Sequence, residues 1–359
     1  MSQVDQRLQA EAAADTAVAE EARPSLARRL AATPVIVTFL FLVVVMVAFS
    51  VAAPGTFATT SNIRQLAQNV AILTVVSVGT TFIIATAGID LSIPSGIVLG
   101  EVFAVKALSF IHVGSGTAVD ANSDQTKLSY MLVALVGSLV AGLAIGLING
   151  FTVGYMRIPP MLATLGTLGA GLGVALLMQN GVNIATYALN PVATGHVIPF
   201  ASGFSNLVLI ALVVVIVGFV GLHYTVFGRH TLAIGSNEEA ARRVGIKVER
   251  HLLKVYVVGG LASGFAGYLS VAYFSTTSVA GHSTDNLQAI TAVALGGTSL
   301  FGGIANVLGT LIGVWIPAVL QNGFVILGVQ PYWQMVAVGF VLVFAVWLDQ
   351  FRRRTRSRS

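Results

Sequence analysis

Apolar runs of about membrane length recur from one end of the chain to the other, separated by shorter polar stretches. A helix needs about 20 mostly apolar residues to cross a bilayer, and all but one of the runs approach that length. We therefore predict an all-α polytopic membrane protein with about ten transmembrane helices, including short or broken ones. The runs lie near residues 34–52, 66–87, 94–111, 128–153, 160–179, 206–224, 251–273, 287–299, 303–323 and 333–350.

The composition agrees with a membrane protein and excludes several other classes. Hydrophobic residues make up 55% of the 359 residues and charged residues 9%, and the mean hydropathy is +0.86, far outside the range of soluble domains. The absence of cysteine excludes structural disulfides, thiolate metal sites and a cysteine nucleophile. We expect neither a metal nor a cofactor.

The net charge of +5 reflects topology, because the basic residues flank membrane segments and form no stripe that would bind nucleic acid. If the chain starts inside, alternation of the spans leaves only Arg64 and Lys127 in outer loops and Lys106 within a span. The other basic residues then lie inside, which is the bias of cytoplasmic loops. We expect both termini to be cytoplasmic, with arginines of the C-terminal tail contacting anionic membrane lipid. The expected parts are a flexible N-terminal tail (1–30), a transmembrane domain (31–351) and a basic tail (352–359).

The longest polar interruption between two membrane-length runs covers residues 228–250. Ser236 and Asn237 supply an N-cap, acidic residues follow at once and basic residues come later, as in a short helix whose charges suit its dipole. Gly245 predicts the end of that helix. Because a helix of about two turns is not stable alone in water, we expect it to dock on a soluble cytoplasmic partner.

Two glycine-bearing breaks interrupt apolar runs, at residues 86–92 and 295–303. Irregular backbone at membrane depth persists only where it is buried in protein or lines a wet cavity, and broken helices at corresponding positions point to the path of a transported solute. Hydroxyl and amide groups suit a neutral ligand on such a path. The candidate path residues are Asp90, Ser92, Asn149, Gly296, Gly297, Thr298 and Ser299.

Asp90 and Glu101 are carboxylates in apolar surroundings, where a charge costs at least about 2.5 kcal/mol. Asp90 precedes Pro94, and proline is favoured in a first helical turn, so Asp90 caps the next helix, contacts the solute, or does both. Glu101 is expected to face the bundle interior or a neighbouring subunit. As a proton carrier it would make the protein an ion-coupled secondary transporter, although the spans contain no evident His or Arg relay for it.

Thr164 and Thr167 lie three residues apart, on one face of the span that begins near residue 160. That face either packs against another helix or turns polar groups toward a pore, and we favour packing. The small residues that continue the pattern are Gly166, Gly169, Gly171 and Gly173.

The sequence contains no enzyme signature. The zinc motif HExxH, the nucleophile elbow GxSxG and the phosphate-binding loop GxxxxGK[ST] are all missing. We therefore expect no catalytic residue, and energy from ATP would have to come from another subunit. An intramembrane enzyme is the least favoured function.

Four motifs, in the same order, resemble the inner-membrane permeases of bacterial ATP-binding-cassette (ABC) importers for monosaccharides of the ribose, xylose and galactose type. The resemblance covers residues 34–350. The motifs are AGIDLS at 87–92, NG at 149–150 with RIPPMLATLGT at 157–167, GRHTLAIGSNEEAARRVGI at 228–246, and ALGGTSLFGG at 294–303.

The resemblance implies a homodimeric permease with a pair of cytoplasmic ABC ATPase subunits and a periplasmic or lipid-anchored sugar-binding protein. The implied function is import of a monosaccharide or related polyol by alternating access, and an ion-coupled transporter of a small polar solute is the second hypothesis. A basic helix lying on anionic lipid is the alternative for the short cytoplasmic helix. The residues that match the family's coupling helix, which docks into the ATPase, are Glu238, Glu239, Ala240, Ala241 and Gly245.

The chain departs from the residues that are usual in this family at five positions close to the expected path. Ala87, Pro94 and Ala305 stand where glycines are usual, and Asn286 and Gln288 stand where acidic residues are usual. These departures leave the identity of the sugar open.

Overall fold

The computed structural model describes residues 34–110, 128–194 and 205–356, and each run predicted to be a span is a helix. No strand occurs in these residues, which confirms the all-α class. The expected N-terminal tail (1–30) and the outer loop near 112–127 lie outside the described residues. The helices are α3 (Pro34–Ala52), α4 (Thr60–Ala85), α5 (Ile93–Phe110), α6 (Leu128–Gly154), α7 (Pro160–Met178), α9 (Asn206–His223), α12 (Val248–Phe274), α13 (Asp285–Leu295), α14 (Val307–Ile326) and α15 (Pro331–Arg356).

Within the described ranges, eight of these helices are long and apolar enough to cross a membrane. The two exceptions are α13, which has 11 residues, and α15, whose apolar part is limited to Tyr332–Phe344. The ten predicted spans therefore correspond to eight full-length helices and two shorter apolar elements.

Four short elements complete the fold: α8 (Asn190–Thr194), α10 (Val226–Ser236), α11 (Glu238–Arg243) and the 3-10 helix η2 (Ala280–His282). The hydrophobic pattern assigned no helix to α10. The buried face of α10 consists of Gly228, Thr231 and Ile234, so small and polar residues occupy most of the positions where an apolar stripe would have revealed the helix.

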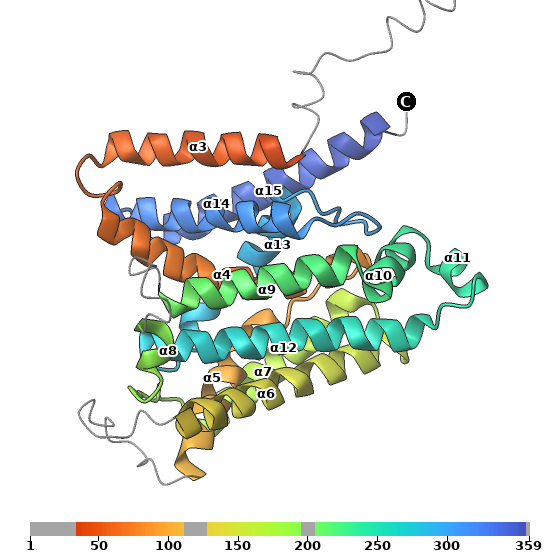
Figure 1. Ribbon diagram of the computed structural model, residues 1–359, viewed down its shortest axis with the longest axis horizontal. Helices are drawn as coiled ribbons and strands as arrows, with labels where there is room; N and C mark the ends of the chain where they lie inside the picture. The colour runs from red at the N-terminus through yellow and green to blue at the C-terminus, as the bar shows by residue number, and fades with distance from the viewer. Residues whose placement is uncertain (1–33, 111–127, 195–204, 357–359) are drawn as a thin grey trace, which may run out of the picture.

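Most long helices run roughly along one axis, so the bundle has two ends (Figure 1). Helix α11 projects from one end, here called the α11 end, and the first residues of α3 and the last turns of α15 lie toward it. Helix α8 and the turn between α3 and α4 lie at the opposite, α8 end. The two predicted breaks, between α4 and α5 and between α13 and α14, belong to the α11 end, because both contact α10 there.

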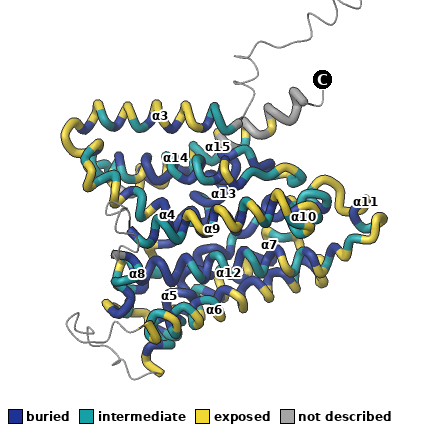
Figure 2. The backbone as a smooth tube through the Cα atoms, viewed as in Figure 1, coloured by how far each residue is buried: buried dark blue, intermediate teal, exposed yellow. Residues whose placement is uncertain are grey.

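The core of the bundle is built on α4, α5 and α12, whose apolar segments are mostly buried. Only 17% of the apolar segment is buried in α3 and in α7, and α3 lies at the outside of the bundle (Figure 2). For a protein that crosses a membrane, such exposed apolar faces meet lipid or another subunit.

Helices α5, α6 and α12 approach one another to backbone contact through glycines. A side chain on Gly142 of α6 would collide with the backbone of Gly260 and Gly264 of α12, and one on Gly267 would collide with α5. Small residues permit this close packing between membrane helices. Gly296 of the second break and Gly309 of α14 are in similar contact.

The glycines of α7 differ from this pattern, and the prediction that they pack is wrong for three of them within the described chain. Gly166, Gly169 and Gly173 have open space where a side chain would lie, and only Gly171 packs, against Ser95 of α5. The prediction fails because these three glycines lie on the outer face of α7. Their spacing in the sequence does not tell the outer face from the inner one.

Candidate functional site

The helix predicted in the polar interruption is present as α11, with the predicted ends. Asn237 forms its N-cap, because the side chain accepts a hydrogen bond from the Ala240 N–H at 2.9 Å. At the other end Gly245 has a φ of +87°, and the Ile246 N–H donates to the Ala241 carbonyl at 3.1 Å. This is the Schellman arrangement, in which glycine takes the left-handed conformation after the last helical turn.

The α11 helix presents charge outward and is attached to the bundle by its inner side. Glu238, Glu239 and Ala240 are exposed, as is Gly245, whereas Ala241 is buried among apolar residues of α10 and α12. The exposed surface of α11 is therefore available to a partner at the end of the bundle.

Ion pairs form within α11 and between α11 and the start of α12. Arg243 pairs with Glu239 at 2.6 Å and Arg242 with Glu238 at 2.8 Å. Arg242 also pairs with Glu249, at the start of α12. Arg157, in the turn before α7, lies 3.7 Å from the same Glu249. The hydrogen bonds that Arg242 donates to Glu238 and Glu249 raise the pKa of Arg242 above its usual value, so its guanidinium stays charged at any physiological pH.

The two breaks meet each other and α10 at a single junction. The Gly303 N–H donates to the Ala85 carbonyl at 3.0 Å, which joins the second break to the end of α4. Gly235 of α10 has no room for a side chain between Ala85 and Gly303. Gly302 and Gly303 both have positive φ, +80° and +78°, a conformation that favours glycine. Helix α10 is thus in direct contact with the junction of the two breaks.

At the first break, two of its residues and one residue each from α6 and α7 form a buried chain of hydrogen bonds. The Asp90 Oδ1 accepts from the Ser92 N–H and Oγ at 2.8 and 2.6 Å. Asn149 of α6 donates to the Ser92 Oγ at 2.7 Å, and Thr167 of α7 donates to the Asn149 Oδ1 at 2.6 Å. Asp90 therefore orders the residues that precede α5, in keeping with the capping hypothesis, and the chain ties three helices together.

Thr164 joins the same break, because it accepts a hydrogen bond from the Leu91 N–H at 3.0 Å. The face of α7 that carries Thr164 and Thr167 is thus packed against the break and against α6. Close by, the buried Tyr256 hydroxyl lies against Gly88 and has no hydrogen-bond partner among the described residues.

In the second break, Gly296 and Gly297 end α13. Thr298 accepts a hydrogen bond from the Asn306 N–H at 3.1 Å, and the Ser299 N–H donates to the Ile304 carbonyl at 3.0 Å. The candidate path residues therefore form two clusters at the α11 end, held mainly by bonds within the chain. Their contact with a solute stays a prediction.

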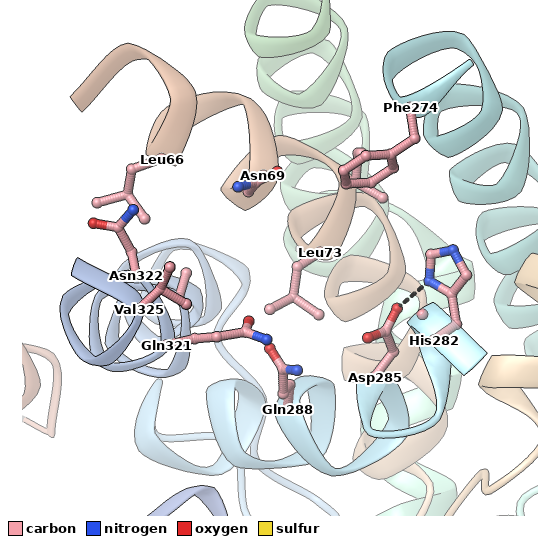
Figure 3. A pocket seen from close by; sticks show the side chains of 13 residues that line it. Leu66, Asn69, Leu73, Phe274, His282, Asp285, Gln288, Gln321, Asn322 and Val325 are labelled. Carbon is pink, nitrogen blue, oxygen red and sulfur yellow. Dashed lines mark hydrogen bonds and ion pairs between the residues drawn. The ribbon is translucent and has the colours of Figure 1, made fainter. Parts of the chain in front are cut away.

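A cavity of about 350 Å³ lies at the opposite, α8 end, between α4, α13, α14 and the end of α12. None of the candidate path residues lines it. Its polar wall carries four amide side chains, one carboxylate and one imidazole, and Figure 3 shows Asp285, Gln288 and Gln321 around the same space. The polar lining residues are Asn69, His282, Asp285, Gln288, Gln321 and Asn322.

The sequence patterns did not predict most of these cavity residues. Gln288 stands out only as a departure from the family, and Asn69, Gln321 and Asn322 belong to none of the motifs. A usable signal existed, because polar side chains within apolar spans are costly and mark functional paths. Asn322 is held in place by a pair of reciprocal hydrogen bonds with Asn62, at 2.9 and 3.0 Å.

Glu101 is fully buried, and it has a histidine partner that comes from outside the spans, where no partner was predicted. His282 lies outside the spans, in η2, and its Nε2 is 2.9 Å from the Glu101 Oε1. The His282 Nδ1 is 2.7 Å from the Asp285 Oδ2, in the cavity wall. Glu101 also accepts from the Ser270 hydroxyl at 2.7 Å and from the Ser278 N–H at 2.8 Å.

The pKa of His282 responds to two opposing causes. Burial alone lowers the pKa, but hydrogen bonds to Asp285 and Glu101 outweigh it and raise the pKa of His282 to about 10. The imidazole is therefore a cation at neutral pH.

Comparison with known proteins places these features in context. A family model described as "Branched-chain amino acid transport system / permease component" matches residues 62–346. The chain is 35% identical to the ribose import permease protein of Bacillus subtilis over 317 residues, 87% of this chain and 91% of that protein. Identity to the fructose import permease protein of Rhizobium meliloti is 29% over 334 residues, 90% of this chain and 88% of that protein.

A third relative is the galactose/methyl galactoside import permease protein of Escherichia coli, 31% identical over 316 residues, 86% of this chain and 92% of that protein. No solved structure matches the chain.

Proposed function

This chain belongs to the family of branched-chain amino acid transport system permease components, and from that membership we propose that it imports a monosaccharide or related polyol as the permease subunit of an ABC importer. It is a multi-pass protein of the bacterial cytoplasmic membrane. The relatives named as import permeases for ribose, fructose and galactose support the sugar class. The same names favour the importer over the ion-coupled transporter.

The observation that carries the proposal is the route from α11 to the two breaks. A cytoplasmic ATPase subunit supplies the energy, because this sequence has no phosphate-binding loop. The segment that docks into it consists of Glu238, Glu239, Ala240, Ala241 and Gly245. Closure of the ATPase pair then moves α11, and α10 transmits the movement to the junction of Ala85 and Gly303. The two ends of the bundle then open one at a time, and this is alternating access.

The cavity at the α8 end supports a sugar over a branched-chain amino acid. An amino acid carries a carboxylate, which pairs best with a cationic side chain. The described cavity lining contains no Lys or Arg, and its polar groups are mainly amides, which bind hydroxyls as both donors and acceptors. After the cavity has opened inward, the solute contacts a second set of residues at the α11 end. These are Asp90, Ser92, Asn149 and the residues 296–299.

Three further partners complete the proposal. A periplasmic or lipid-anchored sugar-binding protein delivers the solute at the α8 end, and a second copy of the permease covers part of the exposed apolar surface. Membrane lipid covers the rest. The α11 end is cytoplasmic, so both termini are cytoplasmic as well, which agrees with the distribution of basic residues.

Co-purification tests the role of α11. The tagged permease is purified from its own membranes as wild type, as Glu239→Arg and as Arg229→Glu, and the eluates are assayed for ATP hydrolysis. We expect an ATPase with wild type and with Arg229→Glu, which changes an exposed residue of α10 outside the α11 segment. We expect its loss with Glu239→Arg, because a reversed charge in the docked surface costs several kcal/mol.

Two outcomes would overturn the proposal. If Glu239→Arg retains the ATPase as well as wild type, α11 is not the coupling element. If no ATPase accompanies any of the three proteins, and the permease alone accumulates sugar in proteoliposomes under a proton gradient, the ion-coupled transporter is correct.

A further inference from the structure

We propose that the chain Glu101–His282–Asp285 fixes an ionised carboxylate in the wall of the cavity, where it binds adjacent hydroxyls of the solute and excludes acidic sugars. This selectivity site deepens the proposed sugar import and rests on it. Asp285 is the binding group, and Glu101 and His282 are positioning residues that act through it.

The hydrogen-bond pattern fits an imidazolium placed between two ionised carboxylates. Both ring nitrogens of His282 face carboxylate oxygens, at 2.9 Å for Glu101 and 2.7 Å for Asp285. An ionised carboxylate only accepts hydrogen bonds, so both nitrogens must carry a proton and the ring is a cation. Glu101 accepts from two further donors, Ser270 and Ser278, so all of its hydrogen bonds are ones that an ionised carboxylate can accept. With Asp285 ionised, the chain carries one net negative charge.

The remaining negative charge is exposed to the cavity. The side chain of Glu101 is 0% exposed and that of His282 8%, whereas that of Asp285 is 17% exposed. Within the described chain Asp285 makes its side-chain hydrogen bond through Oδ2, and Figure 3 shows the second oxygen on the side of Gln288 and Gln321. A buried cation thus holds the carboxylate at one oxygen and leaves the other for a ligand.

The surroundings of Asp285 suit a neutral polyhydroxylated ligand. Hydroxyls donate to a carboxylate in strong, charge-assisted hydrogen bonds, and the neighbouring amides accept from or donate to the next hydroxyl along the ring. The volume of about 350 Å³ lies at the lower end of the range of small-molecule sites, as a monosaccharide requires.

An acidic sugar meets an unfavourable charge in the same place. The described lining offers no Lys or Arg, and the one cation, His282, is already shared between two carboxylates. A carboxylate or phosphate on the solute would approach Asp285 without a counter-charge, and like charges brought together in a cavity repel strongly.

The test measures binding and transport separately. Uptake of radiolabelled D-ribose, D-fructose and D-galactose is measured in proteoliposomes that hold the permease, its ATPase and its binding protein. Binding of the sugar taken up best is then measured on the permease–ATPase complex in detergent, so that the binding protein does not select the ligand. D-galactose and D-galacturonate, which differ by an acid group, serve as competitors.

For wild type we expect displacement of the labelled sugar by D-galactose and not by D-galacturonate. Asp285→Asn should weaken sugar binding at least about tenfold, since it replaces a charge-assisted hydrogen bond, and should narrow the difference between the two competitors. Glu101→Gln should act in the same direction more weakly, and Glu101→Asp should restore part of the loss. Arg64→Gln, which removes an exposed charge near the same end, should bind like wild type.

Three outcomes would overturn the proposal, and the first of them needs only the wild-type protein. If D-galacturonate displaces the label from wild type as well as D-galactose does, the cavity has no charge selectivity. If Asp285→Asn binds with unchanged affinity while wild type transports sugar, the site fails and the importer stands. If wild type takes up none of the three sugars and no ATPase co-purifies with it, the proposed function fails and this proposal with it.

Discussion

At the scale of single residues, Glu101 and His282 illustrate how a membrane protein keeps charges in its interior. Each is nearly or fully buried, and a buried ion pair loses about 3–5 kcal/mol when one partner is removed, because the other charge is left without compensation. The charged groups that face His282 are Glu101 of α5 and Asp285 of α13, while α12 contributes the neutral Ser270. The pair is therefore vulnerable at both members.

The stability of the His282→Gln variant should change less than that of wild type as the pH rises into the alkaline range. The fold raises the pKa of His282 from 6.5 to about 10, so its contribution is complete below pH 6.5 and is lost as the pH rises through about 10. The melting temperature of His282→Gln should lie below that of wild type near neutral pH, and the difference should shrink toward pH 10. Thermal unfolding in detergent across this range measures it.

The control for this prediction is His230→Gln, at the α11 end, which should show no such convergence. A constant difference between wild type and His282→Gln at all pH values would contradict the ionised state assigned to the histidine.

At the scale of single elements, local signals predicted α11 well and α10 not at all. Asn237 and Gly245 define the ends of α11 through bonds within a few residues, which a sequence displays directly. Helix α10 depends on close approach to Ala85 and Gly303, which are distant in sequence. The glycines of α6 and α7 raise the same difficulty, because whether a glycine face is packed depends on the neighbour.

Gly142→Ala and Gly166→Ala should therefore have different effects, although both place alanine in the middle of a long helix. The new methyl group at Gly142 collides with the backbone of α12 and should destabilise by about 1–3 kcal/mol through overpacking. Gly166 has open space, so alanine there should be neutral or stabilise by up to about 1 kcal/mol through helix propensity. Thermal unfolding of the two purified variants compares them.

Equal destabilisation by the two substitutions would contradict this prediction. It would indicate that the α7 face carrying Gly166, Gly169 and Gly173 is packed against a second chain.

At the scale of the whole molecule, the sequence predicted the apolar helices and their order, although two of them are shorter than a span. It could not predict the cavity, because the groups that form it come together only in the fold. Glu101 and His282 are 181 positions apart, and Asn62 and Asn322 are 260 apart. A pattern along the chain carries no information about such pairs. The candidate path residues were identified as conspicuous breaks, and their hydroxyl and amide groups turned out to bond largely to one another.

Labelling of introduced thiols checks the orientation of the molecule, since the chain has no cysteine of its own. Val325→Cys places a thiol at the cavity on a residue that is 60% exposed, and Val244→Cys places one on the 77% exposed residue after α11. In intact cells with a permeable outer membrane, a membrane-impermeant maleimide should label Val325→Cys. It should label Val244→Cys only after the cytoplasmic membrane is opened, and the reverse result would invert the topology.

The glycine contacts also determine which parts of the protein can move. Where two helices touch through their backbones, no layer of flexible side chains remains between them to absorb a change in spacing. We therefore expect α5, α6 and α12 to travel as one stiff body, and α13 with α14 as another, joined at Gly296 and Gly309. Helix α4 lies between these bodies and contacts both. We therefore expect the two bodies to rotate relative to each other about α4, because such a rotation opens one end of the bundle and closes the other without separating the glycine contacts.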